Sequence, residues 1–282
     1  MLHRILVPLD VSPGTASAIR LAASIAKQLR QDGRANVMLE GLGIVDTDQI
    51  PRGRFAAVAS PDEMLENARA KARELVADFH KLALAEGLDE ASLEERVSEG
   101  SPTTVIAHHH VFADMVVMTD TCSFPPVTRD YETLVHLMFE SSRPILVVPE
   151  EATAVKEVLM VMDGTATSSR MMYAYVHLNP FPKAKVTVVR STYEEQHHNL
   201  KDFFLRMERY MAGFGIEIKH TRVDGHMMEQ LPDLIEREKT DLVAVGLHRE
   251  HLLHKFAAPL HLVDMPVEEL MRRTGVSLFT VH

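Results

Sequence analysis

Two aspartates each follow a short apolar run and precede small polar residues. Asp10 ends the run at residues 5–9, and Asp163 ends the run at residues 158–162. Such a run, followed by a turn and a helical pattern, predicts a buried strand leading into a helix. In open α/β sheets, ligands bind outside the carboxyl ends of the strands, so both carboxylates are expected where ligand chemistry takes place. The alternative, which has equal weight, is that each Asp caps the turn or helix that follows it.

The rest of the chain alternates expected strands and helices around these two positions. Strands are predicted at residues 5–10, 35–45, 93–97, 113–118, 144–149, 158–162, 185–189, 216–222, 241–245 and 277–281. Helices are predicted at residues 16–30, 61–86, 102–112, 128–142, 168–177, 194–214, 227–239 and 266–274. Near-continuous apolar strands that alternate with helices favour parallel sheets covered on both faces.

The order of elements in the first half returns in the second half. The segment at residues 113–117 is echoed at residues 240–244, and the Asp-ended strand occurs once in each half. A length of 282 residues suits two domains of ordinary size. We therefore expect one domain over residues 1–150 and a second over residues 151–282.

Composition excludes several classes of function. The chain is 46% hydrophobic and 25% charged, which is typical of a folded globular protein, and its net charge of -10 argues against a nucleic-acid partner. A single cysteine, Cys122, allows no internal disulfide and suits a reducing compartment. No apolar run reaches the roughly 20 residues that span a bilayer, and the N-terminus has no signal-peptide pattern. We expect a cytoplasmic protein with no membrane contact.

Taken in order, these motifs resemble a tandem universal stress protein, with one copy in each half. The first copy is marked by residues 5–10, 99–102, 113–118 and 143–149, and the second by residues 158–163, 240–246 and 277–281. The resemblance implies two five-stranded parallel α/β units of flavodoxin scale, similar to the adenine nucleotide alpha-hydrolase fold and related by a pseudo-twofold axis. It also implies that the last strands of the two domains pair within the chain, or in a homodimer.

ATP-binding members of that family carry a loop of the form G-2x-G-9x-G-S/T after the fourth strand. The glycines let the backbone approach phosphates, and the helix N-terminus donates N–H groups to them. In the first half the three glycine positions are occupied by Thr119, Cys122 and about Glu132, and the loop contains Pro125 and Pro126, which have no N–H. In the second half Gly246 remains, and the next position is Arg249.

We therefore expect that neither half binds ATP in the usual way of the family. The leading interpretation is a non-catalytic stress-response protein that binds a small metabolite or a protein partner and uses no cofactor. The alternative is a regulator that binds ATP or AMP at one working site in the second half, with slow ATP hydrolysis as its enzymatic form. Candidate ligand-binding residues are Asp10, Asp163, Gly164, Gly246 and Arg249.

Three histidines, His248, His251 and His254, recur every three positions in the expected second ligand loop. A helical turn there would bring imidazoles together as metal ligands. The alternative is a polar loop that carries surface histidines.

A further run, His108, His109 and His110, lies in an expected helix, where adjacent positions point to different faces. Solvent exposure or a cap at the helix C-terminus explains this run best. The chain contains no G-x-S-x-G elbow, so the sequence offers no support for Ser-His-Asp catalysis.

Overall fold

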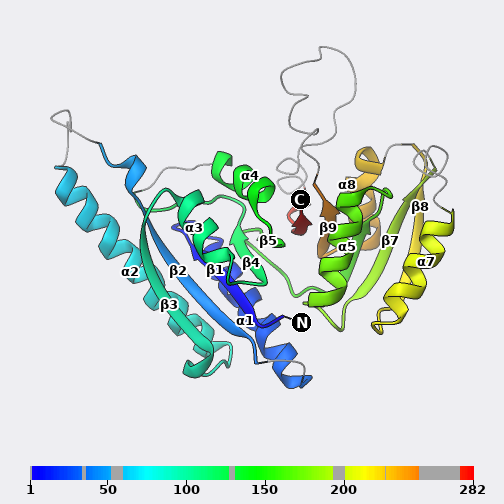
Figure 1. The fold of residues 1–282 in the computed structure, drawn as a ribbon, viewed down its shortest axis with the longest axis horizontal. Helices are drawn as coiled ribbons and strands as arrows, with labels where there is room; N and C mark the ends of the chain where they lie inside the picture. The colour runs from blue at the N-terminus through cyan, green and yellow to red at the C-terminus, as the bar shows by residue number, and fades with distance from the viewer. Residues whose placement is uncertain are drawn as a thin grey trace, which may run out of the picture. The chain divides into compact units, whose positions relative to one another are not determined.

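The computed structural model describes residues 2–33, 36–51, 60–126, 131–192, 201–225, 227–247 and 274–282. The chain forms two compact units, Met1–Ala152 and Thr153–His282, and each is an α/β unit with a parallel sheet (Figure 1). The predicted α/β class is therefore confirmed. Within the described ranges, no helix combines the length and the apolar character that a membrane span requires.

Unit 1 follows the predicted alternation of strands and helices. Its main elements are β1 (Arg4–Leu9), α1 (Thr15–Gln31), β2 (Met38–Asp46), α2 (Pro61–Ala85), β3 (Leu93–Gly100), α3 (Pro102–His110), β4 (Met115–Thr119), α4 (Tyr131–Glu140) and β5 (Ile145–Val148), with short 3-10 turns η1 (Thr47–Gln49) and η2 (Glu90–Ser92). The strands lie in the order β3-β2-β1-β4-β5, and each neighbouring pair is parallel.

Unit 2 repeats this plan. Its described elements are β6 (Glu157–Val161), α5 (Ala166–Leu178), β7 (Lys185–Ser191), α7 (Lys201–Ala212), β8 (Ile218–Val223), α8 (Met227–Glu238), β9 (Leu242–Gly246) and β10 (Ser277–Val281). The strands lie in the order β8-β7-β6-β9-β10, again with parallel pairs. The predicted helix at residues 266–274 falls almost entirely outside the described residues.

Alternation along β2 separates the two faces of the unit 1 sheet. Gly41 lies under Phe79 of α2, where an added Cβ would come within 2.4 Å of the ring. Glu40, the preceding residue, points to the opposite face and contacts His109 of α3. Successive side chains of a strand point to opposite sides, so α2 covers one face and α3 the other.

Strand β3 is longer than the sequence predicts. The apolar pattern indicates a strand only at residues 93–97, but β3 pairs with β2 from Leu93 to Gly100. Its later residues are polar because it is the edge strand of the unit 1 sheet and much of its length is exposed. Pairing with a buried neighbour therefore extends the strand beyond its own apolar signal.

Both units fix the start of their central strands with the same device. The Asp114 carboxylate accepts hydrogen bonds from the backbone N–H groups of His3, at 2.7 Å, and Arg4, at 3.0 Å. In unit 2 the Asp241 carboxylate accepts from the N–H groups of Lys156 and Glu157, at 2.9 and 3.0 Å. The echo at residues 113–117 and 240–244 therefore marks the same anchoring role in each unit.

Replacing either anchoring aspartate should destabilise its own unit. Asp114→Ala and Asp241→Ala each remove the acceptor of two backbone N–H groups, and we expect each to lower the free energy of unfolding by about 1–2 kcal/mol. Urea denaturation of purified variants measures this change. Asp78→Ala, at an exposed position of α2, is the control and should change stability by less than about 0.5 kcal/mol. Losses no larger than that of the control would contradict the anchoring role.

Candidate functional site

The side chain of Asp10 lies at the carboxyl end of β1, as predicted, but it is turned into the protein. Only 1% of the residue is exposed. One carboxylate oxygen accepts from the N–H and hydroxyl of Ser12, at 3.3 and 2.7 Å, and from the Thr15 hydroxyl. The other oxygen accepts from the Thr119 hydroxyl, at 2.7 Å, and from the Ser123 N–H, at 2.9 Å. Asp10 thus joins the loop after β1, the end of β4 and the loop after β4.

The loop after β4 is held down on the ends of β1 and β2. The Ser123 carbonyl accepts from the Val11 N–H at 2.8 Å, and the Pro125 carbonyl accepts from the Asp46 N–H at 2.7 Å. Residues 122–125 are all buried. In the described part of this loop, the backbone groups of Ser123 and the Pro125 carbonyl are therefore bonded within unit 1.

One residue of this loop keeps a backbone conformation that glycine favours. Cys122 occupies the second glycine position of the family pattern and has a φ of 48°, in the left-handed region. Residues other than glycine adopt this region at a cost. The loop therefore has a glycine-like backbone conformation at a position occupied by cysteine.

At the corresponding place in unit 2, Asp163 is partly exposed instead of buried. Its carboxylate accepts from the N–H and hydroxyl of Thr165, at 2.9 and 2.6 Å. Thr165 in turn caps α5 by accepting from the Ser168 N–H at 3.2 Å. Between them, Gly164 has a φ of 81°, which the tight turn requires. Asp163 therefore organises the turn into α5 and also faces solvent.

Gly246, at the end of β9, is required by packing. A Cβ on Gly246 would lie 2.5 Å from the Thr167 carbonyl carbon and 2.6 Å from the Ser168 nitrogen, at the start of α5. In unit 1 the equivalent pair is Thr119 at the end of β4 and Gly14 at the start of α1, whose added Cβ would meet a Thr119 methyl at 3.3 Å. The glycine of the pair is at the start of the helix in unit 1 (Gly14) and at the end of the strand in unit 2 (Gly246).

The remaining predicted site residues cannot be placed in this geometry. Arg249 and the histidines His248, His251 and His254 lie outside the described residues. Within the ranges that are described, no three His, Cys, Asp or Glu side chains gather in a group that could hold a metal ion.

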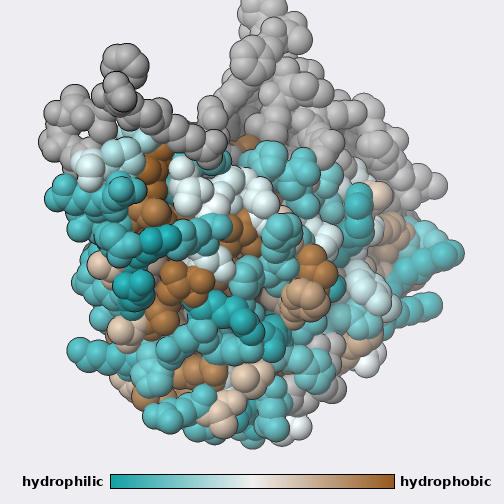
Figure 2. All heavy atoms as spheres, turned by 60° about the vertical axis from the view of Figure 1, so that its left-hand side comes forward, coloured by the Kyte–Doolittle hydropathy of each residue, from teal (hydrophilic) through white to brown (hydrophobic). Residues whose placement is uncertain are grey.

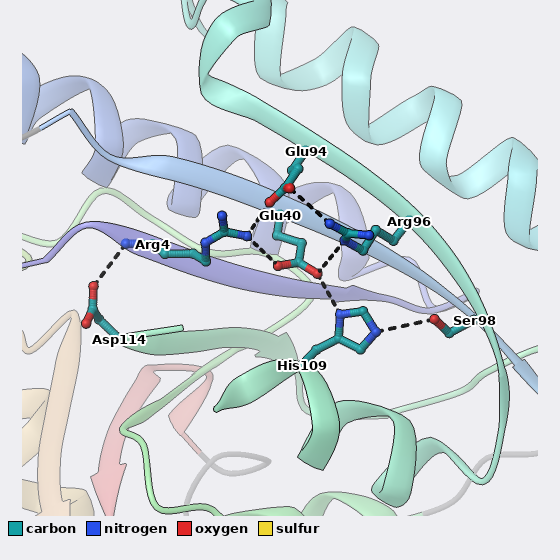
Figure 3. Close-up of polar contacts among 7 residues, drawn as sticks. All are labelled: Arg4, Glu40, Glu94, Arg96, Ser98, His109 and Asp114. Carbon is teal, nitrogen blue, oxygen red and sulfur yellow. Dashed lines mark hydrogen bonds and ion pairs between the residues drawn. The ribbon is translucent and has the colours of Figure 1, made fainter. Parts of the chain in front are cut away.

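An ionic cluster around the buried Glu40 in unit 1 has no counterpart among the sequence predictions (Figure 3). Glu40 on β2 has a side chain that is only 3% exposed, and it pairs with Arg4 of β1 at 2.9 Å. Arg96 of β3 lies 3.6 Å from the other Glu40 oxygen and 3.0 Å from Glu94. Glu94 also pairs with Arg4. Two cations and two carboxylates thus join three neighbouring strands.

The pKa shifts in this cluster follow from the pairing. Burial opposes ionisation of Glu94, but the hydrogen bonds and charges of Arg4 and Arg96 outweigh burial and lower its pKa. Burial likewise opposes the charge on Arg4, and hydrogen bonds to Glu40 and Glu94 outweigh it and raise its pKa. Glu94 and Arg4 are therefore ionised at neutral pH.

His109 extends the cluster toward the protein surface. Its Nδ1 lies 2.6 Å from a Glu40 oxygen, and its Nε2 lies 3.3 Å from the Ser98 hydroxyl. The sequence predicts solvent exposure or a cap at the helix C-terminus for the run at residues 108–110. All three histidines lie in the last turn of α3, where His108 is exposed, His109 is partly buried and His110 is buried beside Ser142. Sequence spacing gave no signal for this arrangement, since the three side chains come from two strands and a helix.

Comparison with solved structures identifies the fold. A universal stress protein from Archaeoglobus fulgidus DSM 4304 matches with a TM-score of 0.67 and 13% identity, over 99% of this chain and 95% of that chain. A functionally unknown protein from Pseudomonas aeruginosa PAO1 matches with a TM-score of 0.54 and 12% identity, over 99% and 92%. No family model and no curated protein matches the sequence. The chain therefore has the fold of universal stress proteins.

A substitution at Gly246, at the end of β9, tests whether this glycine is required for packing on α5. Gly246→Ala places a methyl against the backbone of α5, so we expect a loss of about 1–3 kcal/mol in the free energy of unfolding. The matched control is Gly14→Ala, which has more room and a φ of -68° that alanine adopts readily, and it should cost clearly less stability than Gly246→Ala. Thermal and urea unfolding measure both. Equal stability of the two variants would show that packing does not require Gly246.

Proposed function

We propose that this chain is a tandem universal stress protein that binds a small metabolite or a protein partner in a stress response, without turning over ATP. The observation that carries the proposal is the burial and the internal hydrogen bonding of the Asp10 carboxylate. This carboxylate accepts five hydrogen bonds from the chain itself and is shielded from solvent. A nucleotide would have to displace these partners, and each buried donor that it left without an acceptor would cost about 1–3 kcal/mol.

The loop after β4 supports the same conclusion for unit 1. Phosphates are bound by backbone N–H groups that point into an open loop. Here the Ser123 N–H is already donated to Asp10, and Pro125 and Pro126 have none to offer. We infer that unit 1 has become a structural domain that keeps the frame of the family site.

The alternative function, nucleotide binding by unit 2, is favoured by the exposure of Asp163. This carboxylate lies at the end of β6 beside the start of α5, where adenine, ribose or phosphate groups are recognised in open α/β sheets. Gly164, Gly246 and Arg249 would complete such a site for ATP or AMP, and slow ATP hydrolysis would be its enzymatic form. The close packing of Gly246 on α5 gives that glycine a role that needs no phosphate.

Isothermal titration calorimetry of the full chain with ATP, ADP and AMP distinguishes these functions. We expect no binding heat above that of dilution up to millimolar nucleotide, because the unit 1 site is closed by its own side chains. Saturable binding at micromolar nucleotide would overturn the leading proposal. In that event Asp163→Ala should abolish the binding and Asp10→Ala should leave it, and equal losses would exclude the second unit as the site.

A further inference from the structure

His109 contacts the edge strand β3 and its neighbour β2, and it shares no hydrogen-bond partner with Asp10. The imidazole of His109 on α3 lies between two side chains: Nδ1 faces the Glu40 carboxylate of β2, and Nε2 faces the Ser98 hydroxyl of β3 (Figure 3). We propose that these residues form an orienting carboxylate, a general base and a nucleophile that cleave small activated carboxylic esters through an acyl-serine. This site is independent of the function proposed for the strand ends.

The fold positions all three side chains on one face of the sheet. Glu94, Arg96 and Ser98 alternate along β3, so they share a face, and α3 covers that face with His109 in its last turn. Parallel pairing of β2 with β3 brings Glu40 beside this row. An ionic cluster by itself needs only the two arginines and the two carboxylates. The hydroxyl at the far ring nitrogen is the additional feature that resembles a catalytic triad.

His109 lies between a carboxylate and a hydroxyl. A carboxylate accepts hydrogen bonds, so Glu40, 2.6 Å from Nδ1 of His109, is placed to accept the proton of that nitrogen. The positive charges of Arg4 and Arg96 already balance the negative charges of Glu40 and Glu94. When the ring carries its proton on Nδ1, toward Glu40, the Nε2 lone pair faces Ser98. This is the form that a general base requires.

The distance between Nε2 and the Ser98 hydroxyl, 3.3 Å, is compatible with this role. Catalytic hydrogen bonds are often long in enzymes without substrate and shorten when substrate is bound. Both Ser98 and His109 are partly exposed, whereas Glu40 is buried. The carboxylate is therefore held inside the unit, and the hydroxyl and the imidazole are the two groups with some exposure to a small molecule.

Strand β3 forms the edge of the unit 1 sheet, and an edge strand presents backbone N–H groups that its own sheet does not use. Such groups are suitable donors for the oxyanion that forms when a serine attacks an ester. Figure 2 shows unit 1 from the side of α2 and β3, where hydrophilic side chains predominate and hydrophobic ones form small separate groups. The partial exposure of Ser98 suits a small, reactive ester.

The reaction balances with the residues present and water. Ser98 Oγ attacks the carbonyl carbon of the ester while its proton moves to His109 Nε2. The bond to the leaving oxygen breaks, the alcohol takes the proton from Nε2, and the acyl group stays on Ser98. Water then attacks the acyl carbon with His109 as base, and the proton passes to Ser98 Oγ as the acid departs.

The test uses the full chain with two probes, a fluorophosphonate and p-nitrophenyl acetate. An unactivated serine does not react with fluorophosphonates, so peptide mapping should locate the adduct on Ser98 in the folded protein and find none after heat denaturation. Ester hydrolysis should show a burst of nitrophenol. Ser98→Ala, which removes one atom, should abolish both signals. His109→Gln should lower the rate roughly 100-fold, the usual contribution of a general base.

Ser101→Ala is the matched control, because Ser101 lies on the same segment, is also partly exposed and contacts Thr103 instead of a histidine. It should keep full labelling and hydrolysis. Glu40→Gln tests positioning: the rate should fall and the pH profile should change, with circular dichroism to confirm folding in the presence of the unpaired Arg4 and Arg96. Absence of an adduct on Ser98, or hydrolysis unchanged in Ser98→Ala, would overturn the proposal.

Discussion

The carboxylate of Asp10 is the contact on which the strand-end region of unit 1 depends. Both oxygens are bound by the chain itself, from the loop after β1, from the start of α1, from the end of β4 and from the loop after β4. A buried carboxylate is stable only when it is hydrogen bonded, so these segments must stay together for the unit to stay folded. The same contact that stabilises the unit occupies the position where a ligand would bind.

The contact between a helix start and a strand end is built differently in the two units. The helix that follows the first strand of each unit starts against the end of a neighbouring strand, and one of the two facing residues is a glycine in each unit. Unit 1 places Gly14 on the helix and Thr119 on the strand, and unit 2 places Thr167 on the helix and Gly246 on the strand. The Thr119 side chain thereby becomes available to Asp10. The side chain at the end of β4 thus both packs against Gly14 and binds the Asp10 carboxylate.

Sequence reasoning was successful where a single segment carries its own signal. Apolar runs located the strands, the helix predicted from residue 61 begins there as α2, and the echo of residues 113–117 at 240–244 contains the two anchoring aspartates. Sequence reasoning failed for features that depend on contacts between segments far apart in the chain. Nothing in the sequence indicates that Glu40 is buried, because its partners are 36 to 69 residues away. The polar end of β3 and the pairing of His109 with Ser98 depend on strand pairing in the same way.

Amide hydrogen exchange of Ser123 and Val11, followed by NMR with and without millimolar ATP, tests the central claim most directly. In the structure, the Ser123 N–H is donated to Asp10 and the Val11 N–H to the Ser123 carbonyl. If the chain closes its own site, both amides exchange slowly and neither their exchange rates nor their chemical shifts change with ATP. Rapid exchange at either amide, or a change on adding ATP, would contradict the account.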